Sequence, residues 1–353
     1  MRRNSSPFSF DVALLLKTST LRTVLPESIV ALTFEYLEPT FLPVQGRDAV
    51  FPLLLPGLLT QSIINYIQIV IMRTYFPCPS INWYPGHMHK ATNTIAKKIN
   101  LVDLFIEVRD ARAPLSSANS MLINKPKLIL LNKTDLCAMS YTLKIVEKLK
   151  NQGEKVVLYS AETNANMQNL MKYITENIPL KFKTVGMWMM VGGVPNVGKS
   201  SIINAFRSHS NSFTNNSPAK TGPKPCVTRG VSGFKVSLDP LMYVVDTPGI
   251  LFPKLENKEQ AMKLALIGAI KDEIVGEDVI ADYMIFCLNK LGNYNYVEKL
   301  KLKKPCDTFV EVLGFLQPRY NWDELSIANN LLKQFRAGKF GRITLDRLSQ
   351  LPD

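Results

Sequence analysis

The segment GGVPNVGKSS, residues 192–201, constrains the fold of this 353-residue chain more than any other feature. It fits the phosphate-loop pattern G-x-x-x-x-G-K-[ST] and lies between an apolar run at 187–191 and a helical pattern, as that loop requires. The glycines let backbone N–H groups turn toward phosphates, and the following helix adds its positive end. Lys199 is expected to contact the β- and γ-phosphates, and Ser200 to ligate Mg²⁺. We therefore predict a nucleotide-binding α/β domain.

Two further stretches are candidates to complete a magnesium site. LMYVVDTPGI, residues 241–250, predicts a strand that ends near Asp246, where phosphate-loop proteins hold Mg²⁺ from its second side. The Gly249 N–H is expected to sense the γ-phosphate. Thr228, in a preceding loop rich in glycine and proline, is either a third metal ligand or an ordinary loop threonine.

The apolar run LILLNKTDL, residues 128–136, ends in the N-K-x-D pattern that reads guanine. Asp135 can accept hydrogen bonds from guanine N1–H and the exocyclic amine, which adenine does not offer. Asn132 can brace the loop, and the stem of Lys133 can lie along the base. This pattern normally follows the phosphate loop but precedes it here by about sixty residues. Either it is a chance match, or the chain is a GTPase fold opened at a different point.

A second base-reading element follows the next apolar run. VVLYSAET supplies Ser160 and Ala161, whose backbone can meet guanine O6. Short apolar strands with polar or glycine residues after them predict a mainly parallel sheet covered on both faces. We expect strands at 101–108, 127–131, 155–159, 187–191 and 242–245. Helices are expected at 142–150 and 167–178 and, in a C-terminal helical domain, at 259–270, 276–290 and 324–338.

The positive charge is concentrated in the segment with the nucleotide motifs. Residues 81–250 hold 21 Lys and Arg against 10 Asp and Glu, which accounts for +11 of the net +13. This surplus favours a polyanionic partner such as RNA, or it keeps the domain soluble. The five scattered cysteines argue against a disulfide scaffold or a zinc site and suit a reducing compartment. Candidate RNA contacts are Lys97, Lys98, Arg109, Arg112, Lys299, Lys301, Lys303, Lys304, Lys333, Arg336, Lys339 and Arg342.

Residues 1–80 differ from the rest and are expected to form a targeting or membrane-associated extension. The stretch 51–72 carries no charged residue over 22 positions, long enough to span a bilayer. Pro52 and Pro56 oppose a spanning helix, and acidic residues oppose a transit peptide. The alternatives are a non-essential extension or a translation start at Met72.

The order of motifs resembles the circularly permuted GTPases of the YlqF/RbgA class, within which the mitochondrial ribosome-associated GTPase 1 branch is the most similar. The resemblance covers about residues 82–350 and is strengthened by WYPGHMHKA (83–91), VRDARAPLSSAN (108–119) and the segments 262–290 and 335–348. It implies a circularly permuted Ras-like P-loop GTPase domain at 81–255 with a mostly parallel sheet. A small all-helical C-terminal domain that binds RNA and the ribosome follows at 256–353.

The resemblance also implies ligands and partners. It implies a GTPase that helps to assemble the large subunit of the mitochondrial ribosome, contacting rRNA and ribosomal proteins. We expect the protein to dock in the GTP state, to be released on hydrolysis and to be a monomer. We expect it to lie in the matrix or peripherally on the matrix face of the inner membrane. Mg²⁺ is expected on Ser200, Thr228 and Asp246, and K⁺ is a candidate on Asn196. The GTP-binding set is Asn132, Lys133, Thr134, Asp135, Ser160, Ala161, Asn196, Val197, Gly198, Lys199, Ser200, Ser201, Thr228 and Gly249.

The sequence indicates the residue that drives GTP hydrolysis less directly than the residues that bind the nucleotide. Many GTPases orient water with a glutamine just after D-x-x-G, but Ile250 stands there, so slow turnover stimulated by a partner is expected. By resemblance, His87 either orients the water or anchors an N-terminal turn or touches RNA. Cys226 stands where relatives usually have glycine. Two other functions stay open: an RNA-binding module with nucleotide as a structural ligand, and a membrane-attached GTPase.

Overall fold

The computed structural model describes residues 72–81, 99, 101–118, 125–161, 167–178, 186–214, 233–245 and 257–351. These residues belong to one compact unit, residues 65–353. Several sequence predictions fall outside the described residues: those on His87, Lys97, Lys98, Cys226, Thr228, Asp246, Gly249 and Ile250, and on the apolar stretch up to residue 71.

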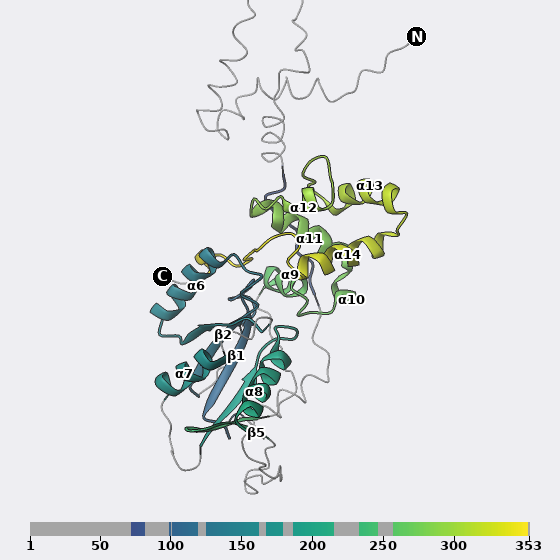
Figure 1. The fold of residues 1–353 in the computed structure, drawn as a ribbon. Coiled ribbons are helices and arrows are strands. Elements are labelled where there is room, and N and C mark those ends of the chain that lie inside the picture. The colour runs from purple at the N-terminus through teal and green to yellow at the C-terminus, as the bar shows by residue number, and fades with distance from the viewer. Residues whose placement is uncertain are drawn as a thin grey trace, which may run out of the picture. The chain divides into compact units, whose positions relative to one another are not determined.

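A six-stranded sheet forms the core of the nucleotide-motif region, with strand order β3-β2-β1-β4-β6-β5. All neighbouring pairs are parallel except β5 with β6, which confirms the predicted, mostly parallel sheet (Figure 1). Asp110 and Asn132, the last residues of two neighbouring strands, lie opposite each other in the register. The strands are β1 (Leu104–Asp110), β2 (Lys127–Asn132), β3 (Val156–Leu158), β4 (Met187–Gly192), β5 (Gly233–Leu238) and β6 (Leu241–Val245).

Both faces of the central strands are buried, as their nearly continuous apolar sequence predicts. Along β1, Leu104, Ile106 and Val108 enter the largest core cluster, whereas Phe105 enters a smaller one on the opposite face. The edge strand β5 was not predicted. Of its apolar side chains only Val236 is fully buried and Leu238 is 63% exposed, so its sequence lacks a strong hydrophobic pattern.

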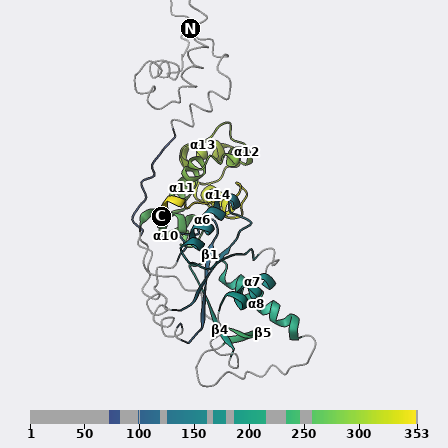
Figure 2. The same ribbon diagram turned by 90° about the vertical axis from the view of Figure 1, so that its left-hand side faces the viewer.

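Three helices cover the sheet: α6 (Met139–Asn151), α7 (Met167–Asn177) and α8 (Lys199–Thr214). α7 and α8 lie side by side and their apolar residues join the largest core cluster (Figures 1 and 2). α6 instead packs through Ile145, Val146 and Leu149 against Ile129 and other residues of the opposite face. The helices predicted at 142–150 and 167–178 are thereby confirmed.

The C-terminal part is helical, as predicted. The first helix ends four residues earlier than expected, because Gly268 adopts φ +81° and turns the chain. The helix at 309–320 was not predicted, although Thr308 caps it by accepting from Glu311 N. The helices are α9 (Lys258–Leu266), α10 (Asp272–Val275), α11 (Glu277–Lys290), α12 (Asn295–Lys299), α13 (Phe309–Tyr320), α14 (Glu324–Arg336) and the 3₁₀ turn η2 (Leu348–Gln350).

After α14 the chain returns to the sheet, which the sequence did not indicate. Leu345 N donates to Arg112 O at 2.7 Å, and Ile343 N donates to Leu136 O at 3.2 Å. Farther on, Lys148 Nζ of α6 donates to Leu351 O at 3.1 Å, and Figure 1 shows the end of the described chain beside this helix. Among the helices that the structure describes, none has the length and apolar character needed to cross a membrane.

Candidate functional site

The phosphate loop connects β4 to α8 and depends on two glycines with left-handed backbone geometry. Gly193 has φ +146°, and a Cβ there would lie 2.2 Å from Val108 O. Gly198 has φ +97°, and a Cβ there would lie 2.2 Å from Asn132 Nδ2. Any side chain would therefore force the loop away from the neighbouring strands, and only glycine suits both positions.

Lys199, the first residue of α8, closes this loop. Its Nζ donates to Val194 O at 2.6 Å. Burial lowers the pKa of this amine to about 8, since a charged group loses hydration there. A bound phosphate would supply the negative charge that favours the protonated amine. The predicted phosphate-binding role of Lys199 therefore fits its position.

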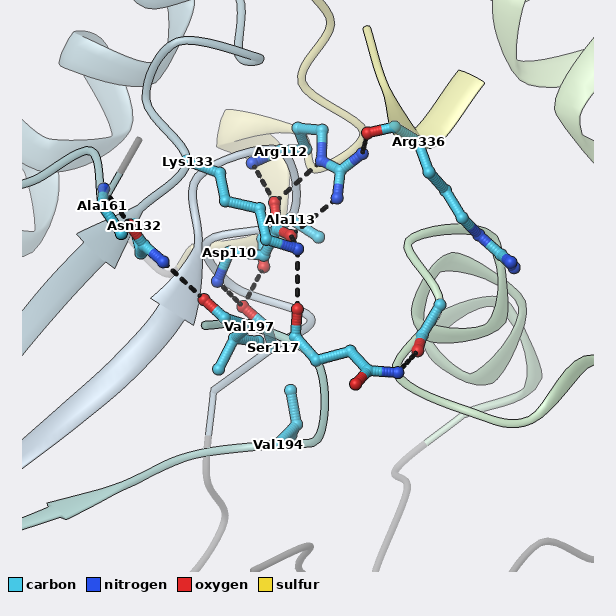
Figure 3. Close-up of polar contacts among 12 residues, drawn as sticks. Asp110, Arg112, Ala113, Ser117, Asn132, Lys133, Ala161, Val194, Val197 and Arg336 are labelled. Carbon is cyan, nitrogen blue, oxygen red and sulfur yellow. Dashed lines mark hydrogen bonds and ion pairs between the residues drawn. The ribbon is translucent and has the colours of Figure 1, made fainter. Parts of the chain in front are cut away.

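Asn132 joins the three loops that were expected to hold the nucleotide (Figure 3). Its Nδ2 donates to Val197 O of the phosphate loop at 2.8 Å. Its Oδ1 accepts from Ala161 N at 3.1 Å. The side chain is buried, with both its donor and its acceptor paired. The bracing role predicted for Asn132 is thus visible, and the base-reading motif adjoins the phosphate loop despite its early place in the sequence.

The other residues that were predicted to read the base lie around the same contacts of Asn132. Ser160 Oγ donates to Asp135 Oδ1 at 2.7 Å, which holds one carboxylate oxygen in a fixed direction. Thr134 Oγ1 donates to Tyr159 O at 3.1 Å, joining the two loops. Lys133 has φ +63° and donates from Nζ to Asn196 O at 2.7 Å. The structure therefore brings the N-K-T-D and Ser-Ala stretches together, and both adjoin the phosphate loop.

Asp110 is a member of this site that sequence reasoning did not single out. Its carboxylate is fully buried, pairs with Arg112 Nη2 at 2.8 Å and lies 3.1 Å from Lys133 Nζ. Burial alone would raise the pKa of Asp110, but the cations of Arg112 and Lys133 outweigh it and hold the pKa below its usual value. The available signal was its place at the end of a strand beside the strand that leads to N-K-T-D.

Two predicted RNA contacts are wrong. Arg109 is buried and donates from Nε and Nη2 to the two oxygens of Glu107, each at 2.9 Å. Arg112 is buried against Asp110. Charge counting cannot distinguish a buried, paired arginine from a solvent-exposed one, and neither guanidinium is available to a phosphate of RNA.

Asn196 links the phosphate loop to the helical region. Its Nδ2 donates to Gly268 O at 2.6 Å, in the turn between α9 and α10. Because a carbonyl can only accept, the amide nitrogen faces Gly268 and leaves Oδ1 as the oxygen available to a cation. The carboxamide therefore fits the role of a K⁺ ligand inferred from resemblance.

The magnesium set is described only in part. Ser200 is exposed at the second residue of α8, where its hydroxyl fits the oxygen ligands that Mg²⁺ prefers. Thr228 and Asp246 lie outside the described residues. Within the described ranges no group of three His, Cys, Asp or Glu side chains could hold a metal ion. Four cysteines (Cys78, Cys137, Cys287 and Cys306) are free thiols in the structure.

Comparisons with known proteins find GTPases. Residues 189–310 match the family described as 50S ribosome-binding GTPase. Mitochondrial GTPase 1 of Aedes aegypti is 35% identical over 78% of this chain and 97% of its own length. Mitochondrial ribosome-associated GTPase 1 of Mus musculus is 35% identical over 75% of this chain and 90% of its own length. Ribosome biogenesis GTPase A of Priestia megaterium is 32% identical over 77% of this chain and 98% of its own length.

The fold has solved counterparts too. The GNP-bound structure of YlqF from T. maritima is 26% identical, with a TM-score of 0.51, over 73% of this chain and 98% of that one. A GDP-bound structure of YlqF gives the same TM-score at 25% identity, over 72% of this chain and 99% of that one. With the strand that leads to N-K-T-D before the phosphate-loop strand in one mostly parallel sheet, the chain belongs to the family of circularly permuted GTPases that includes ribosome biogenesis GTPase A and mitochondrial ribosome-associated GTPase 1, and it is a GTPase.

Proposed function

We propose that this GTPase assists the assembly of the large subunit of the mitochondrial ribosome, docking in the GTP state and leaving after hydrolysis. The observation that carries the proposal is the Asn196–Gly268 hydrogen bond, which joins the phosphate loop directly to the helical region. The names of its relatives supply the ribosomal partner and the mitochondrial location. Residues 81–255 would form the GTPase domain, and residues 256–353 the part that contacts the ribosome.

In this proposal the described residues bind and orient the nucleotide. Asp135 reads guanine, Asn132 aligns the base-reading and phosphate loops, and Lys199 binds the phosphates. Mg²⁺, held by Ser200 with Thr228 and Asp246, would neutralise charge on the phosphates. Val197, Gly198 and Ser201 would contribute from the phosphate loop, and Gly249 from the switch.

Hydrolysis is assigned to a residue outside the described ranges. We propose that His87 orients the attacking water, with an anchoring or RNA-contacting role as the competing assignment. Because Ile250 can neither orient nor deprotonate water, turnover is expected to be slow without the ribosome. The same proposal places the protein in the matrix, in peripheral contact with the inner membrane, as a monomer. It also places K⁺ on Asn196.

The RNA-contacting surface is assigned to the end of α13. Arg319 donates to Leu300 O at 3.0 Å and to Lys301 O at 3.3 Å, so the basic run at 299–304 lies against this helix end. Tyr320 and Trp322 follow, 47% and 44% exposed, with ring centroids 5.3 Å apart. Exposed aromatic rings beside cations suit unpaired bases and phosphates of RNA. An adjoining cavity of about 420 Å³ is lined by Trp322, Ser326, Asn329, Asn330 and Lys333.

Cosedimentation with mitochondrial large-subunit particles tests the proposed function. The protein is expected to pellet with the particles in the presence of a non-hydrolysable GTP analogue and to stay in the supernatant with GDP. Replacing Lys299, Lys301 and Lys303 by glutamate should weaken pelleting and make its salt dependence shallower, by roughly 0.7–0.9 in the log–log slope for each RNA phosphate that the variant no longer neutralises.

The matched control is Lys144→Glu, which reverses an exposed charge on α6, away from that surface. Its pelleting should equal that of the wild type. Equal pelleting of the wild-type protein with GDP and with the analogue would contradict the docking cycle. Guanine nucleotide binding without any pelleting would favour a GTPase with another partner, including a membrane-attached one.

A further inference from the structure

Six residues form a closed circuit of polar and packing contacts between the nucleotide site and the helical region. Figure 3 shows the part of it made by Lys133, Asp110, Arg112 and the carbonyl of Arg336. Lys133 Nζ is the junction, because it lies 3.1 Å from Asp110 Oδ2 and donates to Asn196 O at 2.7 Å. Two routes lead from this amine to the helices. The members of this polar circuit are Lys133, Asp110, Arg112, Arg336, Gly268 and Asn196.

The first route runs through buried charge. Arg112 donates from Nε to Asp110 Oδ1 at 3.0 Å and from Nη2 to Oδ2 at 2.8 Å. Its Nη1 reaches Arg336 O, the last residue of α14, at 3.4 Å. Asp110 is therefore held from the helical side while it contacts the base-reading lysine from the other.

The second route runs through the turn between α9 and α10. The Arg336 guanidinium donates to both Asp272 oxygens at 2.7 and 2.6 Å, to Leu266 O at 3.1 Å and to Ala265 O at 2.9 Å. A Cβ on Gly268 would lie 3.2 Å from Arg336 Nε, so the guanidinium also packs against this residue. Gly268 O then accepts from Asn196 Nδ2 at 2.6 Å. One side chain thus fixes the turn that holds the phosphate loop.

We propose that Arg336 is a positioning residue for the guanine nucleotide site, whose guanidinium acts through Gly268 and Asn196 on the phosphate loop. Its backbone carbonyl, which any residue at this position keeps, accepts from Arg112 and so adjoins the buried pair with Asp110. The inference rests on the proposed nucleotide function. It replaces the prediction that Arg336 contacts RNA, since its guanidinium is engaged within the chain. The helical region is then part of the nucleotide site and not only a docking platform.

The chemistry of Arg336 makes this role specific. Lysine has one ammonium and cannot donate at once to a carboxylate and to two carbonyls in the fixed directions of a guanidinium fork. Methionine keeps the apolar stem and removes every donor. Without the fork, the turn from Ala265 to Asp272 no longer has the hydrogen bonds that orient Gly268 O. The Asn196 side chain is then without a fixed acceptor.

Nucleotide affinity tests the inference. Arg336→Met is expected to weaken binding of a fluorescent GDP, measured in the full-length protein, by about fivefold to tenfold, within the usual range of coupling between sites. Faster GDP dissociation should account for the weaker binding. Lys271→Met removes an exposed cation one residue from Asp272 and should bind GDP as the wild type does. Arg336→Lys should lie between the wild type and Arg336→Met.

A double-mutant cycle separates positioning from general destabilisation. Asn196→Ala removes the side chain that donates to Gly268 O. Arg336→Met should therefore weaken GDP binding much less in that background than in the wild type. Effects that add fully would overturn the Gly268–Asn196 route, and equal affinity of Arg336→Met and wild type would overturn the inference.

If Arg336→Met does not fold, Asp272→Asn is the milder probe. It keeps the shape of the side chain but removes the charge that aligns the fork, and about a twofold to threefold faster GDP release is expected. Wild-type release would overturn the inference through this variant as well. Failure of the wild-type protein to bind GDP would instead overturn the proposed function.

Discussion

Asp135→Asn is expected to lower the affinity for GTP and GDP by about a hundredfold or more and to create affinity for xanthine nucleotides. A carboxylate accepts from both guanine N1–H and the exocyclic amine, whereas an amide also presents donors. Ser160 Oγ donates to Asp135 Oδ1 at 2.7 Å, and this hydroxyl would keep the amide oxygen of the variant turned toward itself. The amide nitrogen then faces the base, where it opposes the guanine amine and suits the carbonyl of xanthine.

Displacement of a fluorescent GDP by GTP and by xanthosine triphosphate measures this switch. Glu147→Gln makes the same carboxylate-to-amide change on an exposed position of α6 and serves as the control. Unchanged GDP affinity in Asp135→Asn would mean that N-K-T-D does not read the base. Failure to bind either nucleotide, with folding intact, would mean that Ser160 does not orient the amide.

The two nucleotide motifs could be predicted because each is a local backbone feature. The phosphate loop needs its glycines at fixed spacing between a strand and a helix. The strand, the loop and the helix follow one another directly in the sequence. The place of N-K-T-D beside that loop followed from one rule: carboxyl ends of parallel strands share one edge of a sheet. The structure confirms this shared edge through the contact between Asn132 and Val197.

Several features were missed because the local sequence does not show which distant residue a side chain meets or whether it is buried. Asn196 meets Gly268 across 72 positions, and nothing in either local sequence indicates the pairing. Arg109 and Arg112 each pair with a carboxylate of β1 two positions earlier, but the sequence does not show that this end of the strand is buried, so both were predicted as surface cations. Residues 343–346 return to the sheet through backbone hydrogen bonds, two polar side chains and the buried apolar side chains of Ile343 and Leu345, and this segment is too short to show a clear hydrophobic pattern.

Asp346 is the buried charge that joins this returning segment to the rest of the chain. Its carboxylate accepts from Leu115 N at 2.7 Å and Ser116 N at 2.8 Å, in the loop after β1. Lys263 Nζ of α9 lies 3.2 Å from its Oδ1, and both side chains are buried. One carboxylate therefore connects the sheet, the first helix of the helical region and the C-terminal segment.

Asp346→Ala is expected to destabilise the protein by about 3–5 kcal/mol. The change leaves the buried Lys263 with only the exposed carboxylate of Glu259, and it leaves two backbone donors and the Ser116 hydroxyl without this acceptor. Urea unfolding measures this destabilisation. Asp346→Asn keeps an acceptor for Leu115 N and Ser116 N and should lower the free energy of unfolding by less than Asp346→Ala does. Glu176→Ala breaks an exposed pair with Lys172 and should cost less than about 1 kcal/mol.

The number of unfolding transitions tests more directly than the free energy of unfolding whether Asp346 connects the two parts. If Asp346 holds the sheet and the helices together, the wild-type protein should unfold in one transition and Asp346→Ala in two, with the helical region separating first. Guanine nucleotide should then stabilise mainly the later transition of the variant, since the phosphate loop stays with the sheet. It should stabilise the earlier transition by the smaller amount that corresponds to the coupling through Gly268 and Asn196. A single transition in Asp346→Ala, stabilised by GDP as in the wild type, would show that other contacts are sufficient to couple the two parts.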